Sequence, residues 1–173
     1  MKAKGEITMH KGCCFTGHRT IAAADREVLG AACDAEIRAL VSRGVADFYT
    51  GGARGFDTLA AQAVLRVRET LPVRLHLILP CRDQCRGWST ADRLRYEEIL
   101  RAADSVRYIG DAYEPDCMRR RNDALVDAAS VCVCYLQNPR SGTGYTVRRA
   151  RAAGLEIIHL LTVEPVQTAL PEI

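Results

Sequence analysis

Apolar residues recur along this chain with two alternating spacings, one typical of buried strands and one typical of helices. Short, largely β-branched runs predict six strands, and segments with apolar residues three and four positions apart predict the helices between them. The predicted strands span residues 11–17, 45–51, 73–80, 105–110, 130–136 and 155–161. The predicted helices span residues 23–43, 56–70, 90–103, 115–129 and 145–153, and the last ten residues are predicted to form a tail.

This regular alternation predicts an α/β fold with a mostly parallel sheet of about six strands between two layers of helices. The strands are short and apolar, as expected when helices cover both faces of the sheet. Ligands of such sheets bind in the crevice outside the carboxyl ends of the strands. We therefore expect the residues that carry chemistry to follow the strands directly.

Polar and glycine-rich segments do follow five of the predicted strands. In chain order they read TGHRT, TGGARGFD, PCRDQCRGW, GDAYEPDCMRRRN and QNPRSGTGYT. The turns that lead from helices back to strands, such as SRGVA and RAAGLE, are plain by comparison. In a parallel sheet all five polar segments face one edge, which is the predicted site.

Length and composition narrow the class of protein. The chain has 173 residues, which suits one domain; we predict a single domain over residues 1–173, with its core at about 11–161 and short tails. No apolar run reaches the ~18 residues of a membrane span, and the first residues lack the apolar core of a signal peptide. These features predict a cytoplasmic protein without a membrane partner. The net charge of +3 is too small to indicate nucleic-acid binding by itself.

Eight cysteines are spread over predicted strands, helices and loops. The close loop pair, Cys81 and Cys85, has a wider spacing than the CxxC pairs of zinc ribbons. Reduced thiols acting as small core residues are the favoured interpretation, and a metal site is the lesser alternative. Because Cys81 and Cys85 flank Gln84 in a loop at the predicted site edge, redox sensitivity stays open for both.

The segment DFYTGGARGFDTLAAQAV leaves the second predicted strand through three glycines and enters a helix. Gly51, Gly52 and Gly55 permit a positive φ and leave no Cβ in the way of a ligand, while the helix N-terminus beyond them favours an anion. The GGxxG spacing matches neither GxGxxG nor a P-loop, so it names no cofactor. Asp57 is either the N-cap of this helix or an acceptor for a sugar hydroxyl.

A second small-residue loop follows the fifth predicted strand. Ser141, Gly142 and Thr143 either offer hydroxyls and amides to a phosphate or form an ordinary strand-to-helix turn. The run Arg119–Arg121 lies in the first turns of the preceding helix, where cations are unfavourable unless an anion is near. Arg121 is therefore predicted to clamp a phosphate, and Asn122 to read a polar group.

Two further loops contain candidate site residues, each of which has two possible roles. His18 and Arg19 follow the first predicted strand, and His18 is either a ligand contact or simply a loop histidine. Trp88 is the sole tryptophan. It either stacks on a nucleobase or anchors its own loop or a subunit contact.

Together these residues resemble the SLOG superfamily, which includes the DNA-processing protein DprA and the cytokinin-activating phosphoribohydrolase LOG. TGGARGFDTLAA is similar to its glycine-rich segment, and RNDALVDAASVCVCYLQNPRSGTGYTVRRA to its second half. The YpsA-like branch resembles the chain most, through FTGHR with Gly17, through Gln84 and Trp88 of QCRGW, and through RYEEILRAAD. The resemblance runs from about Cys14 to Leu160. It implies a Rossmann-like, three-layer αβα domain that binds nucleotides or their derivatives, and a homodimer.

The superfamily does not imply one reaction. LOG enzymes cleave the N-glycosidic bond of nucleoside monophosphates with an Arg and a Glu. When the LOG motifs are aligned with this sequence, the Arg matches Arg121 and the Glu matches Thr146. Thr146 thus stands where LOG has its Glu, and glycoside cleavage needs a carboxylate near its oxocarbenium-like state. Asp57 or Asp123 are the possible substitutes. Whether the chain is an enzyme stays open.

DprA-like proteins bind single-stranded DNA. Aromatic residues make up only 6% of this chain and do not alternate with its basic residues, as a stacking platform for bases prefers. We therefore rank a nucleic-acid module below a nucleotide-binding protein, with the LOG-like hydrolase as the first alternative. No cofactor and no metal are predicted. The predicted ligand-binding residues are Gly17, His18, Arg19, Gly51, Gly52, Gly55, Asp57, Gln84, Trp88, Arg121, Asn122, Ser141, Gly142 and Thr143.

Overall fold

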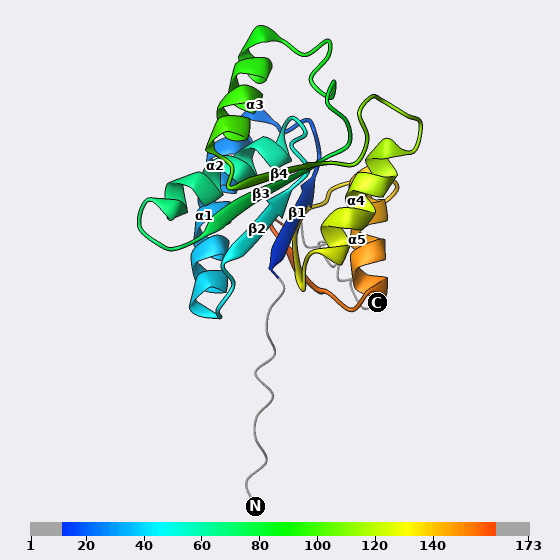
Figure 1. Cartoon of the computed structure of the whole chain (residues 1–173). Coiled ribbons are helices and arrows are strands. Elements are labelled where there is room, and N and C mark those ends of the chain that lie inside the picture. Colours follow the sequence, from blue (N-terminus) through cyan, green and yellow to red (C-terminus); the bar gives the residue numbers. More distant parts are fainter. Residues whose placement is uncertain (1–11, 162–173) are drawn as a thin grey trace, which may run out of the picture.

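In the computed structural model, which describes residues 12–161, six parallel strands form one sheet between two layers of helices (Figure 1). The strands are β1 (Cys13–Gly17), β2 (Asp47–Thr50), β3 (Arg74–Leu79), β4 (Ser105–Tyr108), β5 (Val131–Tyr135) and β6 (Glu156–His159). The helices are the 3-10 turn η1 (Ala23–Asp25), α1 (Arg26–Ser42), α2 (Phe56–Arg68), α3 (Thr90–Ala102), α4 (Cys117–Asp127) and α5 (Gly142–Ala152). The predicted α/β class, with a parallel six-stranded sheet, is confirmed.

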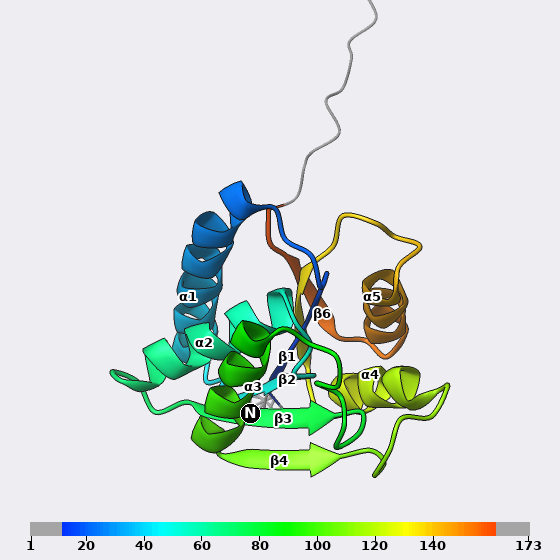
Figure 2. The ribbon, with the colours of Figure 1, turned by 90° about the horizontal axis from the view of Figure 1, so that it is seen from above.

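The strand order β4-β3-β2-β1-β5-β6 determines which helices share a layer. The chain first runs outward from β1 to β4, and it then returns to β5 beside β1 and continues to β6. Crossovers between parallel strands are right-handed, so reversing the direction of travel moves the helices to the opposite face. Accordingly α1, α2 and α3 cover one face of the sheet, and α4 and α5 cover the other (Figure 2).

Each face of the sheet buries its own apolar core. The larger core lies under α1 to α3 and contains the rings of Phe15, Phe48 and Phe56. The ring centroid of Phe15 lies 6.1 Å from that of Phe48 and 6.3 Å from that of Phe56. The smaller core lies under α4 and α5 and contains Cys14 and Cys132, which are aligned on adjacent strands. Alternate residues of the strands therefore serve both cores, as the uninterrupted apolar runs of the sequence indicate.

The predicted elements differ from the observed ones mainly at their ends. Helix α5 begins at Gly142, three residues before the predicted start at Tyr145, because Ser141 accepts a hydrogen bond from the Gly144 amide and caps it. The segment expected to be a loop is therefore the first turn of a helix. The predicted tails and the first residue of the first predicted strand lie outside the described residues.

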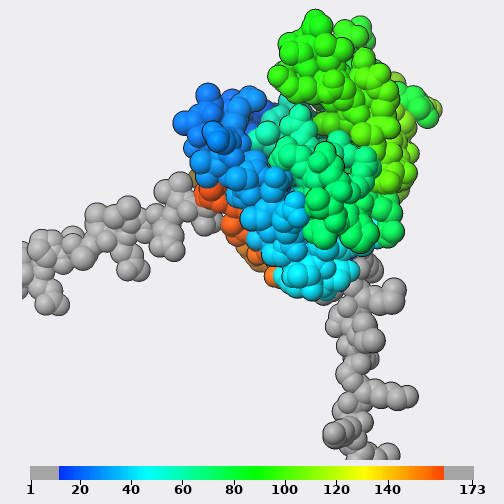
Figure 3. Space-filling model, turned by 90° about the vertical axis from the view of Figure 1, so that its left-hand side faces the viewer, coloured from blue at the N-terminus to red at the C-terminus, as the bar shows by residue number. Residues whose placement is uncertain are grey.

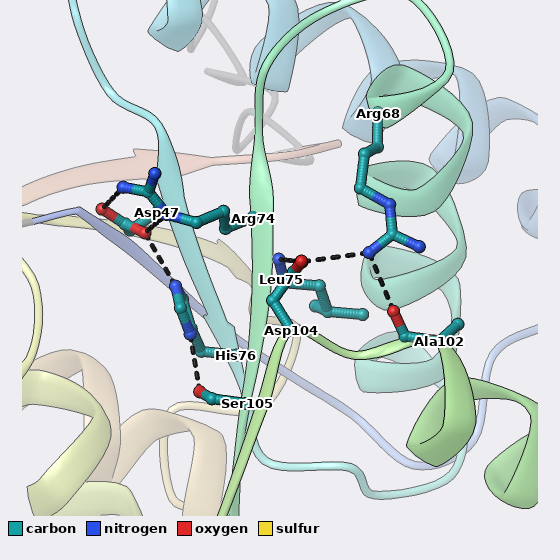
Figure 4. A network of polar contacts seen from close by, with 8 residues as sticks. All are labelled: Asp47, Arg68, Arg74, Leu75, His76, Ala102, Asp104 and Ser105. Atoms are coloured by element: carbon teal, nitrogen blue, oxygen red, sulfur yellow. Dashed lines mark hydrogen bonds and ion pairs between the residues drawn. The ribbon is translucent and has the colours of Figure 1, made fainter.

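A polar network joins β2, β3 and β4 in the half of the sheet away from their carboxyl ends (Figure 4). The His76 ring lies between Asp47 Oδ1 at 2.7 Å and Ser105 Oγ at 2.6 Å. Asp47 also accepts two hydrogen bonds from Arg74, at 2.7 and 2.8 Å. The Arg74 guanidinium, and next the His76 ring, lower the pKa of Asp47 to about 2.

Replacing Asp47 with asparagine tests this network. A carboxyl whose pKa falls from 3.8 to about 2 on folding stabilises the fold above pH 3.8 and loses that contribution as pH falls toward 2. After screening by solvent we expect Asp47→Asn to cost about 1 kcal/mol at pH 7 and nothing near pH 2. Denaturant unfolding of both proteins across this range checks the expectation. Asp111→Asn, which alters a 94% exposed side chain, is the control, and an equal loss in both variants would contradict the network's role.

Candidate functional site

A cavity of about 590 Å³ opens where β1 and β5 end. These neighbouring strands are the point where the chain reverses its direction across the sheet, and ligands of such folds bind there. The lining comes from residues 15–20 at the end of β1 and just after it, and from Ala53 and Asp57 around the start of α2. Helix α4 contributes Met118, Arg121, Asn122 and Leu125, and the segment before and at the start of α5 contributes residues 137–138 and 141–143. Segments remote in sequence thus meet in one crevice.

The segment after β1 forms one wall of this cavity. Gly17 is required there, because a Cβ at this position would lie 2.3 Å from the Phe56 ring. The next residue, His18, is half-buried, and its Nε2 accepts hydrogen bonds from the amides of Gln137 at 2.8 Å and Asn138 at 3.2 Å. His18 thereby ties the β1 loop to the β5 loop across the switch point.

Two backbone amides that donate to one ring nitrogen identify the tautomer of His18. Because Nε2 accepts both bonds, it carries no proton, and the proton of the neutral ring sits on Nδ1. Burial lowers the pKa of His18 below 6.5, in the direction that the two amides favour. The histidine therefore offers a neutral N–H donor at neutral pH, and its contact with a ligand stays a prediction.

A buried acid and a buried base lie side by side at the cavity. Asp57 and Arg121 are 6% and 5% exposed, and Arg121 Nη1 lies 4.0 Å from Asp57 Oδ2. Asp57 Oδ2 also accepts a hydrogen bond from the Ala53 amide at 3.1 Å. The expectation that Asp57 caps α2 is wrong: Gly55 holds the N-cap position, and Asp57 is the second residue of the helix. Burial raises the pKa of its carboxyl, which Arg121 and the Ala53 amide oppose.

Arg121 retains donor capacity toward the cavity. Its Nε donates to Asn122 Oδ1 at 2.8 Å, and Nη1 donates to the Gly51 carbonyl at 2.5 Å. Within residues 12–161 the only acceptor near Nη2 is the weakly accepting sulfur of Met118 at 3.9 Å. A guanidinium carries five donors, so Nη2 can donate to an anion placed in the cavity without giving up its other bonds.

The start of α5 faces the same space. Ser141, Gly142 and Thr143 line the cavity together, and Ser141 is the N-cap. The first amides of a helix have no partner within the helix, and the helix dipole adds partial positive charge there. With Arg19 and Arg121 in the lining and Asp57 as its one carboxylate, the cavity favours a negatively charged group.

The three glycines after β2 serve the fold rather than the cavity wall. A Cβ on Gly51 would lie 2.2 Å from Arg121 Nη1, and one on Gly52 would lie 2.4 Å from Leu79. Gly55 has a φ of 78°, and its Cβ would collide with the backbone after β1. None of the three lines the larger cavity, so their contact with a ligand stays a prediction.

Two other predicted site residues, Gln84 and Trp88, do not line this cavity. Gln84 is buried and donates from Nε2 to the Gly51 carbonyl at 3.3 Å, so it supports the loop that Arg121 also holds. Trp88 packs edge-on against Tyr96, with ring centroids 5.3 Å apart, and the Arg54 guanidinium lies over its ring at 5.5 Å. These contacts match the interpretation of Trp88 as the anchor of its own loop.

The arginine run divides in the way that helical geometry dictates. Arg119 is exposed, and Arg120 pairs with Glu114 and Asp116 outside the cavity. Of the run, only Arg121 points inward and lines the cavity. Its selection from the sequence therefore agrees with its position.

Several lining residues were missed at the sequence level. Thr16, Thr20, Ala53, Gln137 and Asn138 lie in segments recognised as post-strand loops but were not singled out. Their signal was position alone, because each lies at the end of a strand or a few residues beyond it. Leu125 carries no chemical signal apart from its helical spacing from Arg121, whereas Met118 has a place in the resemblance to LOG, whose MxxR pattern matches Met118 and Arg121.

The cysteines behave as core residues. All eight lie within the described part of the chain, all are free thiols, and seven are buried. Burial, and next a contact with Asp83, raise the pKa of Cys81 to about 12, which makes its thiolate scarce at neutral pH. No group of three or more His, Cys, Asp or Glu residues suited to a metal comes together within residues 12–161.

Residues of several SLOG-type segments noted in the sequence, such as FTGHR, line this crevice, and a family comparison agrees with the resemblance. The model of the YspA SLOG family matches residues 14–160. The chain belongs to this family. Members of similar sequence include UPF0398 protein BH1768 of Halalkalibacterium halodurans, which is 32% identical over 67% of this chain and 64% of its own length. UPF0398 protein OB1025 of Oceanobacillus iheyensis is 25% identical over 68% of this chain and 65% of its own length. The chain thus spans just under two thirds of the length of these relatives.

Solved structures extend the likeness of this SLOG chain to DNA processing protein A. The Streptococcus pneumoniae protein superposes with a TM-score of 0.67 at 15% identity, over 88% of this chain and 51% of that one. The Helicobacter pylori protein, described for its single-stranded DNA binding mode, superposes with a TM-score of 0.64 at 16% identity, over 87% of this chain and 65% of that one. At such identities the likeness shows the shared fold. No helix in residues 12–161 is long and apolar enough to span a membrane.

Proposed function

We propose that this SLOG protein binds a nucleotide or a nucleotide derivative in the cavity between the ends of β1 and β5. The observation that carries the proposal is the buried Arg121, whose Nη2 has donor capacity left toward a cavity that also receives the first turn of α5. A volume of about 590 Å³ suits a ligand of nucleotide size. The phosphate contacts Arg121 and the α5 amides, and Asn122 and the neutral His18 supply polar contacts for sugar or base.

The hydrolase alternative has one supporting observation and one against it. Asp57 is a carboxylate in the cavity lining, as cleavage of a glycosidic bond requires. Thr146, which stands at the LOG glutamate position, is fully buried and donates its hydroxyl to the Gly142 carbonyl at 3.1 Å. Release of free base from a nucleoside monophosphate by the wild-type protein would favour the enzyme over the binding protein.

A thermal-shift panel tests the proposal directly. It contains adenosine and guanosine mono-, di- and triphosphates, NAD, ADP-ribose, cyclic nucleotides and a short single-stranded oligonucleotide. A ligand at a hundred times its dissociation constant adds about 2.7 kcal/mol of stability, which raises the unfolding midpoint by several degrees. No shift with any nucleotide overturns the proposal. A shift with the oligonucleotide alone, lost steeply with salt, indicates the nucleic-acid module instead.

A charged side chain introduced at position 142 tests phosphate binding without disturbing the fold. A Cβ at Gly142 meets no atom within 4 Å, so the first turn of α5 accepts a side chain that points into open space. We expect Gly142→Glu to weaken nucleotide binding at least tenfold relative to Gly142→Gln, because an acid repels the phosphate. The same acid stabilises the start of α5 by about 0.5 kcal/mol. Equal affinities of the two isosteric variants, measured by calorimetry at low salt, would contradict phosphate binding at α5.

A further inference from the structure

A second cavity, of about 270 Å³, adjoins the first. It lies between the segment after β1, the start of α2 and the start of α3, on the face opposite to α4 and α5. Figure 3 shows this face, where the surface is hollowed between the blue start of α1, the teal start of α2 and the green α3. Arg19 and Thr20 line both cavities, so this pair of residues forms a wall that the two cavities share.

The lining of the second cavity is strongly basic. Four arginines contribute to it, Arg19, Arg26, Arg54 and Arg95, against the single carboxylate of Asp92. Asp92 is engaged by Arg95 at 3.2 Å and by the Ser89 hydroxyl at 2.9 Å, so it neutralises only one of the four. Arginines that line one cavity repel one another, and an anion bound among them would relieve this repulsion.

Two of these arginines, Arg54 and Arg19, are positioned by packing contacts. Arg54 lies over the Trp88 ring at 5.5 Å, which restrains its guanidinium at the cavity rim. Arg19 reaches the Met118 sulfur on α4 at 3.8 Å and so extends across the mouth of the first cavity. A guanidinium held by a ring face or a thioether keeps most of its N–H donors for an oxygen anion.

We propose that the second cavity is a phosphate subsite, and that the ligand is a nucleotide with a polyphosphate chain running past Arg19 from the first cavity into the second. This inference rests on the proposed nucleotide site. The volume of the second cavity is below the ~300–1,000 Å³ of pockets that enclose a whole ligand, so it suits one end of a molecule held elsewhere. Arg26 and Arg54 bind the distal phosphates, and Arg121 with the start of α5 binds the proximal one.

The test compares adenosine and guanosine mono-, di- and triphosphates on wild-type protein and on the double variant Arg26→Gln/Arg54→Gln. Both side chains are exposed and line only the second cavity, so the fold and the first cavity stay intact. The matched control is Arg93→Gln/Arg101→Gln, which removes two exposed charges from α3 outside both cavities. We expect the triphosphate to bind wild type at least tenfold more tightly than the monophosphate, and the first double variant alone to lose that preference.

The outcomes separate this inference from the proposed function. Unchanged triphosphate affinity in the Arg26/Arg54 variant, with monophosphate binding intact, overturns the subsite and leaves the first cavity as a nucleotide site. No binding of any nucleotide to wild type overturns both. An equal loss in the control variant reveals a general charge effect and overturns the subsite. If a single-stranded oligonucleotide binds through Arg26 and Arg54 and no triphosphate preference is found, the polyphosphate subsite is overturned and the ligand of this cavity is a nucleic acid.

Discussion

Replacing Arg121 with methionine is expected to lower the free energy of unfolding by about 3–5 kcal/mol, the cost typical of leaving a buried charge without its partner. The variant leaves Asp57 in a site where its side chain is 7% exposed, with the backbone amides of Ala53 and Gly51 as remaining hydrogen-bond donors. It also removes the bond to the Gly51 carbonyl that holds the glycine loop. Urea or guanidinium unfolding at pH 7 measures the loss.

The pH dependence of this loss identifies its cause. Burial already raises the pKa of Asp57, and without Arg121 it rises further. A carboxyl whose folded pKa lies above 3.8 destabilises the fold as pH rises past 3.8, since its ionised form is favoured in the unfolded chain. Arg121→Met should therefore be closer to wild type at pH 4 than at pH 7.

A second substitution provides the control for the buried pair. The double variant Asp57→Asn/Arg121→Met carries no charge at either position, and the amide oxygen of the new asparagine still accepts a bond from the Ala53 amide. We expect this variant to recover a large part of the loss at pH 7 and to show no added pH dependence. The single variant Asp57→Asn has its own cost in stability. If that full cost adds to the cost of Arg121→Met in the double variant, the two residues are not coupled, and the buried pair is not the cause of the loss.

Gly144→Ala is expected to destabilise the fold by about 3 kcal/mol, at the upper end of what overpacking costs. A Cβ at this position would lie 2.0 Å from the Pro139 carbonyl oxygen and 2.5 Å from its carbon, and both are backbone atoms. Relief requires the loop 137–141 to move, and this loop carries the two amides that bind His18. Calorimetric or denaturant unfolding gives the stability, and nucleotide affinity should fall in parallel.

The matched control lies two residues earlier in the same helix. Gly142→Ala places a Cβ where no atom lies within 4 Å, and alanine is the better helix former by up to ~1 kcal/mol. We therefore expect Gly142→Ala to be as stable as wild type or slightly more stable. Equal destabilisation by the two alanines would show that the clash with Pro139 is not what requires Gly144.

Local sequence patterns predict much of the fold. The apolar runs and helical spacings predicted all six strands and five helices, because each element must bury its own stripe of side chains whatever its neighbours are. The rule for parallel sheets then placed the site at the carboxyl edge. The position at a helix start pointed to the arginine run as a whole, and the resemblance to LOG pointed to Arg121 within it.

The sequence by itself determined the elements, the parallel sheet and the edge of the site, since these follow from short-range periodicity and chirality. Only the tertiary structure decided the strand order, and with it that β1 and β5 are neighbours and that their ends enclose the cavity. It also decided that Asp57 faces Arg121 and that Gly51 and Gly52 make room for side chains of the protein. These contacts join residues up to about 120 positions apart, as between Cys13 of β1 and Val131 of β5, and no local pattern encodes which remote side chain fills a given space.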